Sequence, residues 1–255
     1  MKTSVDNPLA YKNERFLDSE EARPLRILAE YLSPLEAFHR ERIHDTIVFF
    51  GSARIASGGP MGRYYDEARE LARLVTGWSL TLSPDVHRYI VCSGGGPGIM
   101  EAANRGASDA GGRTIGLNIG LPFEQKPNQW ISPGLCFEFH YFFMRKLWFA
   151  HLARALVVFP GGFGTLDEMM EVLTLTQTGK LERPIPILLY GSAYWREIVN
   201  FEALERHGMI SPKDRELFRF VDDTASALKL LQDCLTDDQP SQTPAIAGSR
   251  TPEGP

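Results

Sequence analysis

The stretch that decides the fold is Leu156–Glu171, LVVFPGGFGTLDEMME. Its apolar run 156–159 predicts a buried strand, and a helix is expected to begin at Thr165. The glycines between them let the backbone approach a ligand without a Cβ clash. A helix N-terminus presents free N–H groups and the positive end of the helix dipole. The stretch is therefore typical of an anion site, most often one for phosphate.

Carboxylates follow this turn at helical spacing. Glu168 and Glu171 fall together on one side of the predicted helix, away from its apolar stripe. A second interpretation needs no ligand, because Thr165 and Glu168 also have the spacing of a capping box. Spacing alone leaves both interpretations open. The apolar stripe comprises Leu166, Met169, Met170 and Leu173.

Three ordered motifs together resemble one known family. Pro160–Glu168 reads PGGFGTLDE, Ser93–Glu101 reads SGGGPGIME, and Met144–Lys146 reads MRK. These match the PGGxGTxxE signature, the GGGxxGxM turn and the helical Arg-Lys pair of the LOG ("Lonely Guy") family, over roughly residues 47–221. Members of that family are phosphoribohydrolases of nucleoside 5′-monophosphates, best known for releasing cytokinin bases. Ordered motifs at consistent separations are more specific than a lone glycine loop.

The resemblance implies a reaction and the residues for it. The expected reaction is hydrolysis of the N-glycosidic bond of a nucleoside 5′-monophosphate, giving free base and ribose 5-phosphate. Glu168 matches the last residue of the signature and is expected to be the catalytic carboxylate, with Arg145 as the catalytic arginine. The residues expected to hold the phosphate are Gly94, Gly95, Gly96, Gly161, Gly162, Gly164 and Thr165. The supporting residues are expected to be Lys146, Glu171, Ser52 and Met144.

Some of these positions also have simpler explanations. The planar guanidinium of Arg145 suits carboxylate or phosphate oxygens, which favours a functional role. Lys146 is equally explained as a solvated, snorkelling side chain, and Glu171 as a surface carboxylate. Arg54, just after the first strand, is either a phosphate ligand or an exposed loop cation.

Composition limits the function classes. The chain has 255 residues, 43% hydrophobic and 23% charged, which is typical of a globular protein. Its net charge of −5 gives no general attraction to nucleic acid or anionic membranes. The three cysteines are far apart and the six histidines form no metal-binding pattern, so neither disulfide, metal nor organic cofactor is predicted. Without a signal peptide or an apolar run of about 20 residues, a cytoplasmic location is expected.

Strands and helices alternate along the chain, and the strands are continuous apolar runs. This pattern predicts an α/β fold, a Rossmann-like doubly wound parallel sheet with helices on both faces. The glycine turns follow the first, second and fifth strands, so they are expected to meet at the carboxyl edge where such folds bind ligands. The expected strands are 46–50, 89–92, 114–117, 136–139, 156–159, 186–190 and 218–221, with a single helix predicted over 194–207.

Segments 1–45 and 236–255 flank the predicted domain, 46–235. The first is expected to be an N-terminal helical extension with no chemistry of its own, in which Pro34 starts or interrupts a second helix. The second is polar and proline-rich, and is expected to be disordered. The helical spacing in the extension is carried by Leu25, Leu28, Ala29 and Leu32.

The segment 141–152 predicts a helix that is apolar almost all round, and such a helix is buried in a core or between subunits. We expect a homodimer or higher homo-oligomer with this helix near the contact, as the resemblance also implies. Active sites completed between subunits are then expected, because Arg145 lies in the same helix. The apolar residues concerned are Phe142, Phe143, Leu147, Trp148 and Phe149.

Alternatives from other classes remain. A non-catalytic nucleotide carrier or sensor would use the same fold and glycine turns. A pyridoxal-phosphate lysine decarboxylase, a label sometimes attached to the family, needs a Schiff-base lysine, and the glycine turns contain none. A nicotinamide oxidoreductase is disfavoured, since no acidic residue follows the first glycine turn at the expected strand end. The base released is left open among AMP, other purine monophosphates and cytokinin ribotides.

Overall fold

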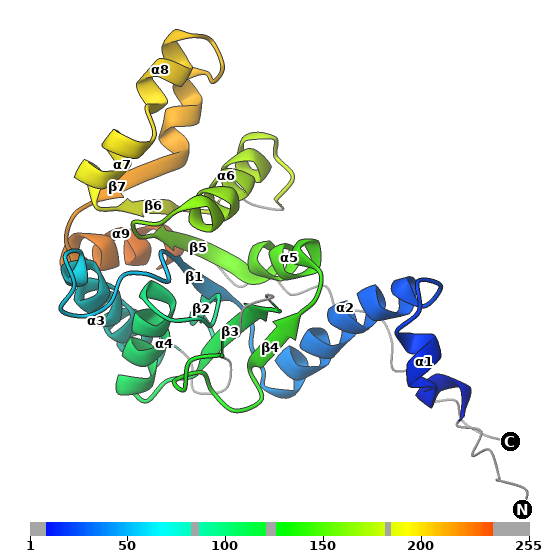
Figure 1. Cartoon of the computed structure of the whole chain (residues 1–255). Coiled ribbons are helices and arrows are strands. Elements are labelled where there is room, and N and C mark those ends of the chain that lie inside the picture. Colours follow the sequence, from blue (N-terminus) through cyan, green and yellow to red (C-terminus); the bar gives the residue numbers. More distant parts are fainter. Residues whose placement is uncertain (1–8, 83–86, 121–125, 182–184, 237–255) are drawn as a thin grey trace, which may run out of the picture.

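A computed structural model describes residues 9–82, 87–120, 126–181 and 185–236. Its sheet confirms the predicted α/β architecture (Figure 1). Within these residues a seven-stranded sheet has the order β4-β3-β2-β1-β5-β6-β7, and all of its neighbouring strands are parallel. The strands are β1 (Thr46–Phe50), β2 (Ile90–Ser93), β3 (Thr114–Ile119), β4 (Cys136–Phe139), β5 (Ala153–Val158), β6 (Ile187–Tyr190) and β7 (Phe218–Val221).

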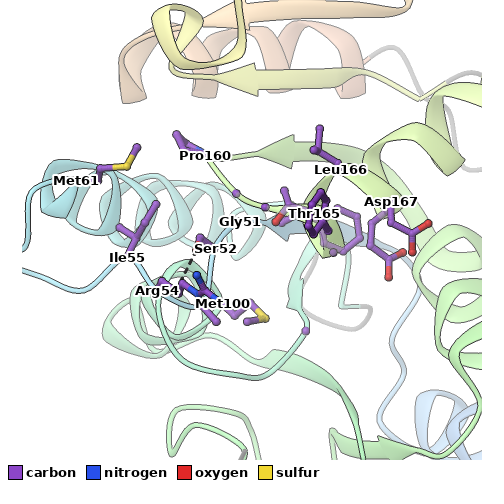
Figure 2. A pocket seen from close by; sticks show the side chains of 18 of the residues that line it. Gly51, Ser52, Arg54, Ile55, Met61, Met100, Pro160, Thr165, Leu166 and Asp167 are labelled. Carbon is purple, nitrogen blue, oxygen red and sulfur yellow. Dashed lines mark hydrogen bonds between the residues drawn. The ribbon is translucent and has the colours of Figure 1, made fainter. Parts of the chain in front are cut away.

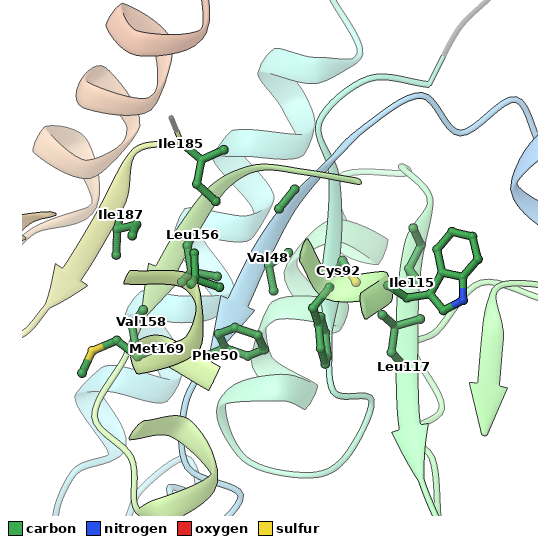
Figure 3. Packing of buried hydrophobic residues seen from close by; sticks show 14 of the residues in the cluster. Val48, Phe50, Cys92, Ile115, Leu117, Leu156, Val158, Met169, Ile185 and Ile187 are labelled. Atoms are coloured by element: carbon green, nitrogen blue, oxygen red, sulfur yellow. The ribbon is translucent and has the colours of Figure 1, made fainter. Parts of the chain in front are cut away.

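Two apolar cores lie on opposite faces of the sheet. Ile47 and Phe49 belong to one core and Val48 and Phe50 to the other, because successive side chains of a strand point to opposite faces. Figure 3 shows the second core, in which side chains from neighbouring strands meet Met169. The first core is covered by α3 (Gly62–Ser79), α4 (Ile99–Asp109) and α9 (Thr224–Thr236), and the second by α2 (Arg23–Arg40), α5 (Phe142–Leu152) and α6 (Phe163–Gln177).

The strand order reverses between β1 and β5. The chain first moves outward from β1 through β2 and β3 to β4, and then returns through α5 to place β5 against β1. The turns that follow β1, β2 and β5 therefore lie side by side at the carboxyl edge of the sheet (Figure 1). A crevice at such a reversal is where open α/β sheets bind their ligands.

Residues 9–45 of the N-terminal segment are largely helical. After η1 (Ala10–Lys12) and α1 (Glu14–Leu17), α2 continues through Pro34 and is not interrupted there. The predicted leucine stripe is not the packed side, since Leu25, Leu28 and Leu32 are exposed. Contacts with the domain outweigh local periodicity, because the opposite side offers aromatic surface to α5 and β4. The side chains that pack inward are Ile27, Tyr31, Leu35 and Phe38.

The predicted helix 194–207 is wrong, because two short helices occupy this segment. They are α7 (Ser192–Ile198) and α8 (Phe201–Arg206). The side chain of Asn200 starts the second helix by accepting a hydrogen bond from the Ala203 N–H at 2.8 Å. A 3₁₀ helix, η2 (Pro212–Leu217), precedes β7. Of the tail predicted over 236–255, Thr236 is the last residue of α9, and the remainder, 237–255, lies outside the described residues.

Helix α5 is not buried all round within the single chain, so of the two predicted modes of burial the chain's own core covers only one side of it. Trp148 is 2% exposed, whereas Phe142, Phe143 and Leu147 are exposed. One face of a sheet together with α2 contacts only part of a helix circumference, so an apolar strip remains uncovered. None of the helices in the described ranges is long and apolar enough to cross a membrane.

Candidate active site

A cleft of about 1020 Å³ opens at the carboxyl edge of the sheet, over β1, β2 and β5. Figure 2 shows the loop after β1, with Ser52, Arg54 and Ile55, on one side of it and Thr165 and Asp167 on the other. A cleft of this size is within the range that holds small-molecule ligands. Its position is that predicted from the glycine turns.

The turn after β5 exposes the N-terminus of α6 to the cleft. This helix begins at Phe163, with Gly162 as N-cap and no side-chain cap. The capping-box interpretation is therefore wrong, because Thr165 and Glu168 lie inside the helix and not at its start. The first N–H groups of a helix have no intrahelical partner, so they are available to an anion. The hydroxyl of Tyr194 fixes the turn by donating to the carbonyl of Gly161 at 2.8 Å.

Space around this turn explains one of its glycines. A Cβ at Gly161 would lie 2.1 Å from Oγ1 of Thr165, so only glycine fits beside that side chain. Gly162 and Gly164 face open space, and all three glycines line the cleft with Thr165. Phe163 is 94% exposed at the mouth of the cleft.

Ser52 joins the turns from neighbouring strands. Its N–H donates to the carbonyl of Pro160 at 3.0 Å, and its carbonyl accepts from the N–H of Ile99 at 3.1 Å. Its hydroxyl accepts from the N–H of Arg54 at 3.0 Å (Figure 2). Ser52 lines the cleft, but its polar groups serve to hold the loop of β1 against the turns at α4 and α6.

The second glycine turn contributes less surface than predicted. Gly94 lines the cleft, whereas Gly95 and Gly96 do not. Asn128 lies behind them and donates through Nδ2 to the carbonyls of Gly95 at 3.0 Å and Gly96 at 3.1 Å. The N–H of Gly95 is engaged too, because it donates to the hydroxyl of Ser93. Hydrogen bonds to Asn128 and Ser93 therefore stabilise this turn, which borders the cleft only at Gly94.

Arg145 and Glu168 reach the cleft from α5 and α6. Nη1 of Arg145 lies 3.8 Å from Oε1 of Glu168, and both side chains are largely buried. Nε of Arg145 donates to the carbonyl of Leu117 at 2.7 Å. A Cβ at Gly94 would lie 2.5 Å from Nη2 of Arg145, so the glycine makes room for the guanidinium. The Arg145 side chain is thus hydrogen-bonded to β3 and packed against the second glycine turn.

The pKa of Glu168 is raised to about 7, chiefly because burial disfavours the charged carboxylate. The nearby charges of Arg145 and Lys146 oppose this rise, while Glu171 and Asp167 add to it. Burial lowers the pKa of the Arg145 guanidinium, and Glu168 partly restores it. A buried carboxyl that titrates near neutrality in a cleft is typical of a catalytic group.

Of the four supporting residues, Ser52 lines the cleft, whereas Lys146, Glu171 and Met144 do not. Nζ of Lys146 forms ion pairs with Asp167 at 2.8 Å and Glu171 at 2.9 Å, so it is not the free surface cation of the simpler interpretation. Glu171, one turn after Glu168 on α6, lines a second hollow instead of the cleft. Met144 is buried in the core.

Several cleft residues were not predicted as site residues. Among the side chains around the cleft are Tyr194 and Ile198 of α7, Phe142 of α5 and Met61 at the start of α3. They carry no local motif, and only the fold brings them to the carboxyl edge. Within the described residues, no group of three or more metal-ligating side chains is placed to hold a metal ion.

Comparison with known proteins identifies the family. A family model described as "Possible lysine decarboxylase" matches residues 100–231, more than half of the chain. The chain belongs to this family, the LOG family. Its cleft carries the PGGxGTxxE signature at Pro160–Glu168 and the arginine of the Arg-Lys pair at Arg145.

Curated LOG relatives align over most of the chain. A protein of Oryza sativa subsp. japonica named probable cytokinin riboside 5′-monophosphate phosphoribohydrolase LOGL9 is 28% identical, over 91% of this chain and 93% of its own length. The cytokinin riboside 5′-monophosphate phosphoribohydrolase LOG3 of Arabidopsis thaliana is 27% identical, over 78% of this chain and 86% of its own.

Solved structures share the fold at low identity. A structural genomics target, TM1055, has a TM-score of 0.53 and 20% identity, covering 74% of this chain and 99% of its own. A molybdenum cofactor binding protein from the phototrophic bacterium Rippkaea orientalis has a TM-score of 0.51 and 17% identity, covering 75% and 98%. At these identities the likeness extends to the fold alone.

Proposed function

We propose that this LOG-family protein hydrolyses the N-glycosidic bond of a nucleoside 5′-monophosphate such as AMP or a cytokinin ribotide. Water adds its hydroxyl to C1′, the bond from C1′ to the base nitrogen breaks, and the base leaves with a proton. The products are free base and ribose 5-phosphate. The named activity of the LOG relatives supports this proposal.

The observation that carries the proposal is the pairing of Glu168 and Arg145 in the cleft, within reach of the α6 N-terminus. The 5′-phosphate binds the free N–H groups at Gly162–Thr165. Loss of the base leaves positive charge on the ribose, as in other glycoside hydrolyses. The Glu168 carboxylate stabilises that charge or activates the water, and Arg145 orients the carboxylate or assists the departing base.

Incubation with 5′-monophosphates tests the activity. AMP, other purine monophosphates and a cytokinin ribotide are each incubated with the protein, and released base is measured by chromatography. We expect release from at least one of them. The matching nucleoside without phosphate should react at least tenfold more slowly, since a charge-assisted contact contributes ~1.5–3 kcal/mol. Equal rates for adenosine and AMP would refute the phosphate assignment.

A carrier or sensor of nucleotides is the second candidate. The Rippkaea orientalis protein shares the fold and is named for binding a cofactor. A carrier has no need of a buried carboxyl whose pKa is raised to about 7 in the binding cleft, which favours catalysis. Tight AMP binding without any base release over hours would favour the carrier instead.

A lysine decarboxylase does not fit the cleft. Pyridoxal phosphate would need a lysine for its Schiff base, and no lysine lines the cleft in the described part of the chain. Lys146, in the helix beside it, is engaged by two carboxylates. The family description is therefore not a guide to this chain's chemistry.

We also infer a homo-oligomer, at least a dimer, through the exposed side of α5. Phe143 and Leu147 are exposed there and line a hollow of about 480 Å³ with α6, to which Leu175 and Ile185 add apolar surface. An exposed apolar strip of this kind is typical of a protein interface. The helix also carries Arg145, so a partner would adjoin the active site.

Cysteines that are all free in the structure support the expected cytoplasmic location.

A further inference from the structure

Glu30 of the N-terminal helix α2 binds the backbone just before α5, the helix that carries Arg145. Oε1 of Glu30 accepts from the N–H of His140 at 2.6 Å, and Oε2 accepts from the N–H of Tyr141 at 3.2 Å. Tyr141 is the N-cap residue of α5, and its own side chain makes no capping hydrogen bond. Glu30 therefore binds the N–H of the N-cap residue and of the residue before it, as the carboxylate of a capping box does, and places its negative charge at the positive end of the helix dipole.

Further contacts fix α5 to the same part of α2. Nε1 of Trp148 donates to the backbone carbonyl of Glu30 at 3.0 Å. The ring of Tyr31 stacks on Trp148 with 5.4 Å between centroids. Nε of Arg26 donates to the hydroxyl of Tyr141 at 3.2 Å. Glu30 thus contacts the N-cap residue of α5 and, two turns later, Trp148.

Arg145 lies between these two points of contact. Its N–H donates to the carbonyl of Tyr141, so the residue whose N–H is bound by Glu30 also begins the turn that carries the arginine. The guanidinium has little freedom at its other end, where Leu117 and Gly94 confine it. A shift of α5 would therefore change the distance from Arg145 to Glu168 and not be absorbed by the side chain.

We propose that Glu30 is a positioning residue, which holds α5 so that Arg145 faces Glu168 in the cleft. It touches neither the cleft nor a reacting atom and acts through the start of α5. The inference rests on the proposed function for its rate effect, and on the contacts alone for its effect on α5. It gives a role to an N-terminal extension in which the sequence indicates no chemistry.

Glu30→Ala and Glu30→Gln test the proposal, with Glu36→Ala as matched control. Glu36 lies on the same helix, is exposed, and pairs only with Arg40 among the described residues. For each variant, kcat and KM are measured for the best 5′-monophosphate, corrected for the folded fraction. Amide hydrogen exchange is followed over residues 140–146. The Glu30→Ala change is also made in an Arg145→Lys background.

We expect Glu30→Ala to lower kcat at least fivefold, since misplacing a catalytic group by ~1 Å can cost ~100-fold. KM should change less than twofold, because α6 and not α5 holds the phosphate. Glu30→Gln keeps one acceptor oxygen and should recover part of the rate. Exchange over 140–146 should be faster than in Glu36→Ala. In the Arg145→Lys background, Glu30→Ala should lower kcat by less than a further twofold.

Two results would overturn the proposal. One is unchanged amide exchange over 140–146 in Glu30→Ala, whatever the activity. The other is an equal fractional loss of kcat in both backgrounds, which would mean that Glu30 acts on the fold and not through Arg145. If the unmodified protein releases no base from any 5′-monophosphate, the proposed function fails by itself. Amide exchange then decides the role of Glu30, and faster exchange supports it.

Discussion

Arg145 and Glu168 face each other from different helices with 3.8 Å between Nη1 and Oε1. This separation is longer than a hydrogen bond, so the pair attracts without closing into a bidentate contact. The pKa of Glu168 consequently stays raised, to about 7, because burial outweighs the arginine's charge. The carboxyl is thereby poised to change its ionisation near neutral pH.

Replacing Glu168 by glutamine should abolish base release and leave nucleotide binding. The phosphate is held mainly by backbone N–H groups at the start of α6, which the substitution does not touch. We expect kcat to fall at least 100-fold, the scale of losing a general base. Turnover and AMP affinity should be measured on one preparation. A variant that turns over at a near-normal rate would remove Glu168 from the mechanism.

Activity should rise with pH through about 7, because the proposed role requires Glu168 ionised. Lys146→Met should move this midpoint upward. The substitution removes a charge that lowers the pKa of Glu168, and it leaves Asp167 and Glu171, which raise that pKa, without their cation. The measurement is kcat/KM from pH 5 to 9 on a single substrate. Lys229→Met, an exposed position on α9, is the control and should keep the original midpoint.

Stability should depend on pH in the direction that a raised carboxyl pKa requires. Folded Glu168 binds its proton up to about pH 7, and the unfolded chain only to about 4.5, so stability falls as pH rises between these values. Glu168→Gln lacks this loss. Its free energy of unfolding relative to the unmodified protein should therefore increase by about 3 kcal/mol in total across the window.

Urea unfolding at pH 5, 6, 7 and 8 would measure this difference. Glu70→Gln is the control, because hydrogen bonding to Arg73 lowers the pKa of Glu70 and its carboxylate is exposed. No such gain with pH is expected for it. A constant difference between Glu168→Gln and the unmodified protein would contradict the raised pKa.

Gly161→Ala should impair phosphate binding, whereas Gly164→Ala should leave the fold intact. The new methyl at Gly161 would collide with Thr165, so the turn must open, at a cost of about 1–3 kcal/mol. The same methyl at Gly164 meets no heavy atom within 4 Å. Thermal unfolding and the KM for AMP measure both effects, and we expect the KM of Gly161→Ala to rise at least tenfold. Equal stability of the two variants would show that the turn is not so tightly packed.

The protein should sediment as a dimer or larger at low micromolar concentration, and Phe143→Asp with Leu147→Asp should give a 28.6 kDa monomer. These side chains are the exposed strip of α5. Trp148 is unsuitable for this test, since it is buried in the chain's own core and its substitution would unfold the protein. Met209→Asp, at an exposed apolar position outside α5, is the control. An unmodified protein that sediments as an active monomer would exclude the interface.

Local signals predicted the sheet well and the helix boundaries less well. Strands 46–50, 136–139 and 218–221 match β1, β4 and β7 residue for residue. The first is a short apolar run, and the other two are short, aromatic-rich segments with one charged residue each. The helix predicted over 194–207 failed at Asn200, whose capping side chain starts a second helix. Periodicity continues across that break, so the pattern alone does not reveal it.

Part of the candidate site was also predictable from local sequence, and part was not. The glycine turns and the Glu168 signature are contiguous in sequence, and strand-turn-helix geometry is local, so the place of the cleft and of the helix N-terminus in it was predictable. Tyr194 and Asn128 were missed because their contacts with Gly161 and Gly95 join segments more than thirty residues apart. No local pattern marks such contacts.

The sequence by itself determined the parallel α/β fold, the edge at which its turns meet, and the residue types available for phosphate and acid–base chemistry. These depend on short-range rules of strand burial, glycine geometry and helix termini. Tertiary structure alone decided that Arg145 faces Glu168, that Glu30 binds the backbone at the start of α5, and that Trp148 is buried while Phe143 is exposed. Which side of a helix packs inward depends on the surfaces that distant segments present, and local periodicity does not contain that information.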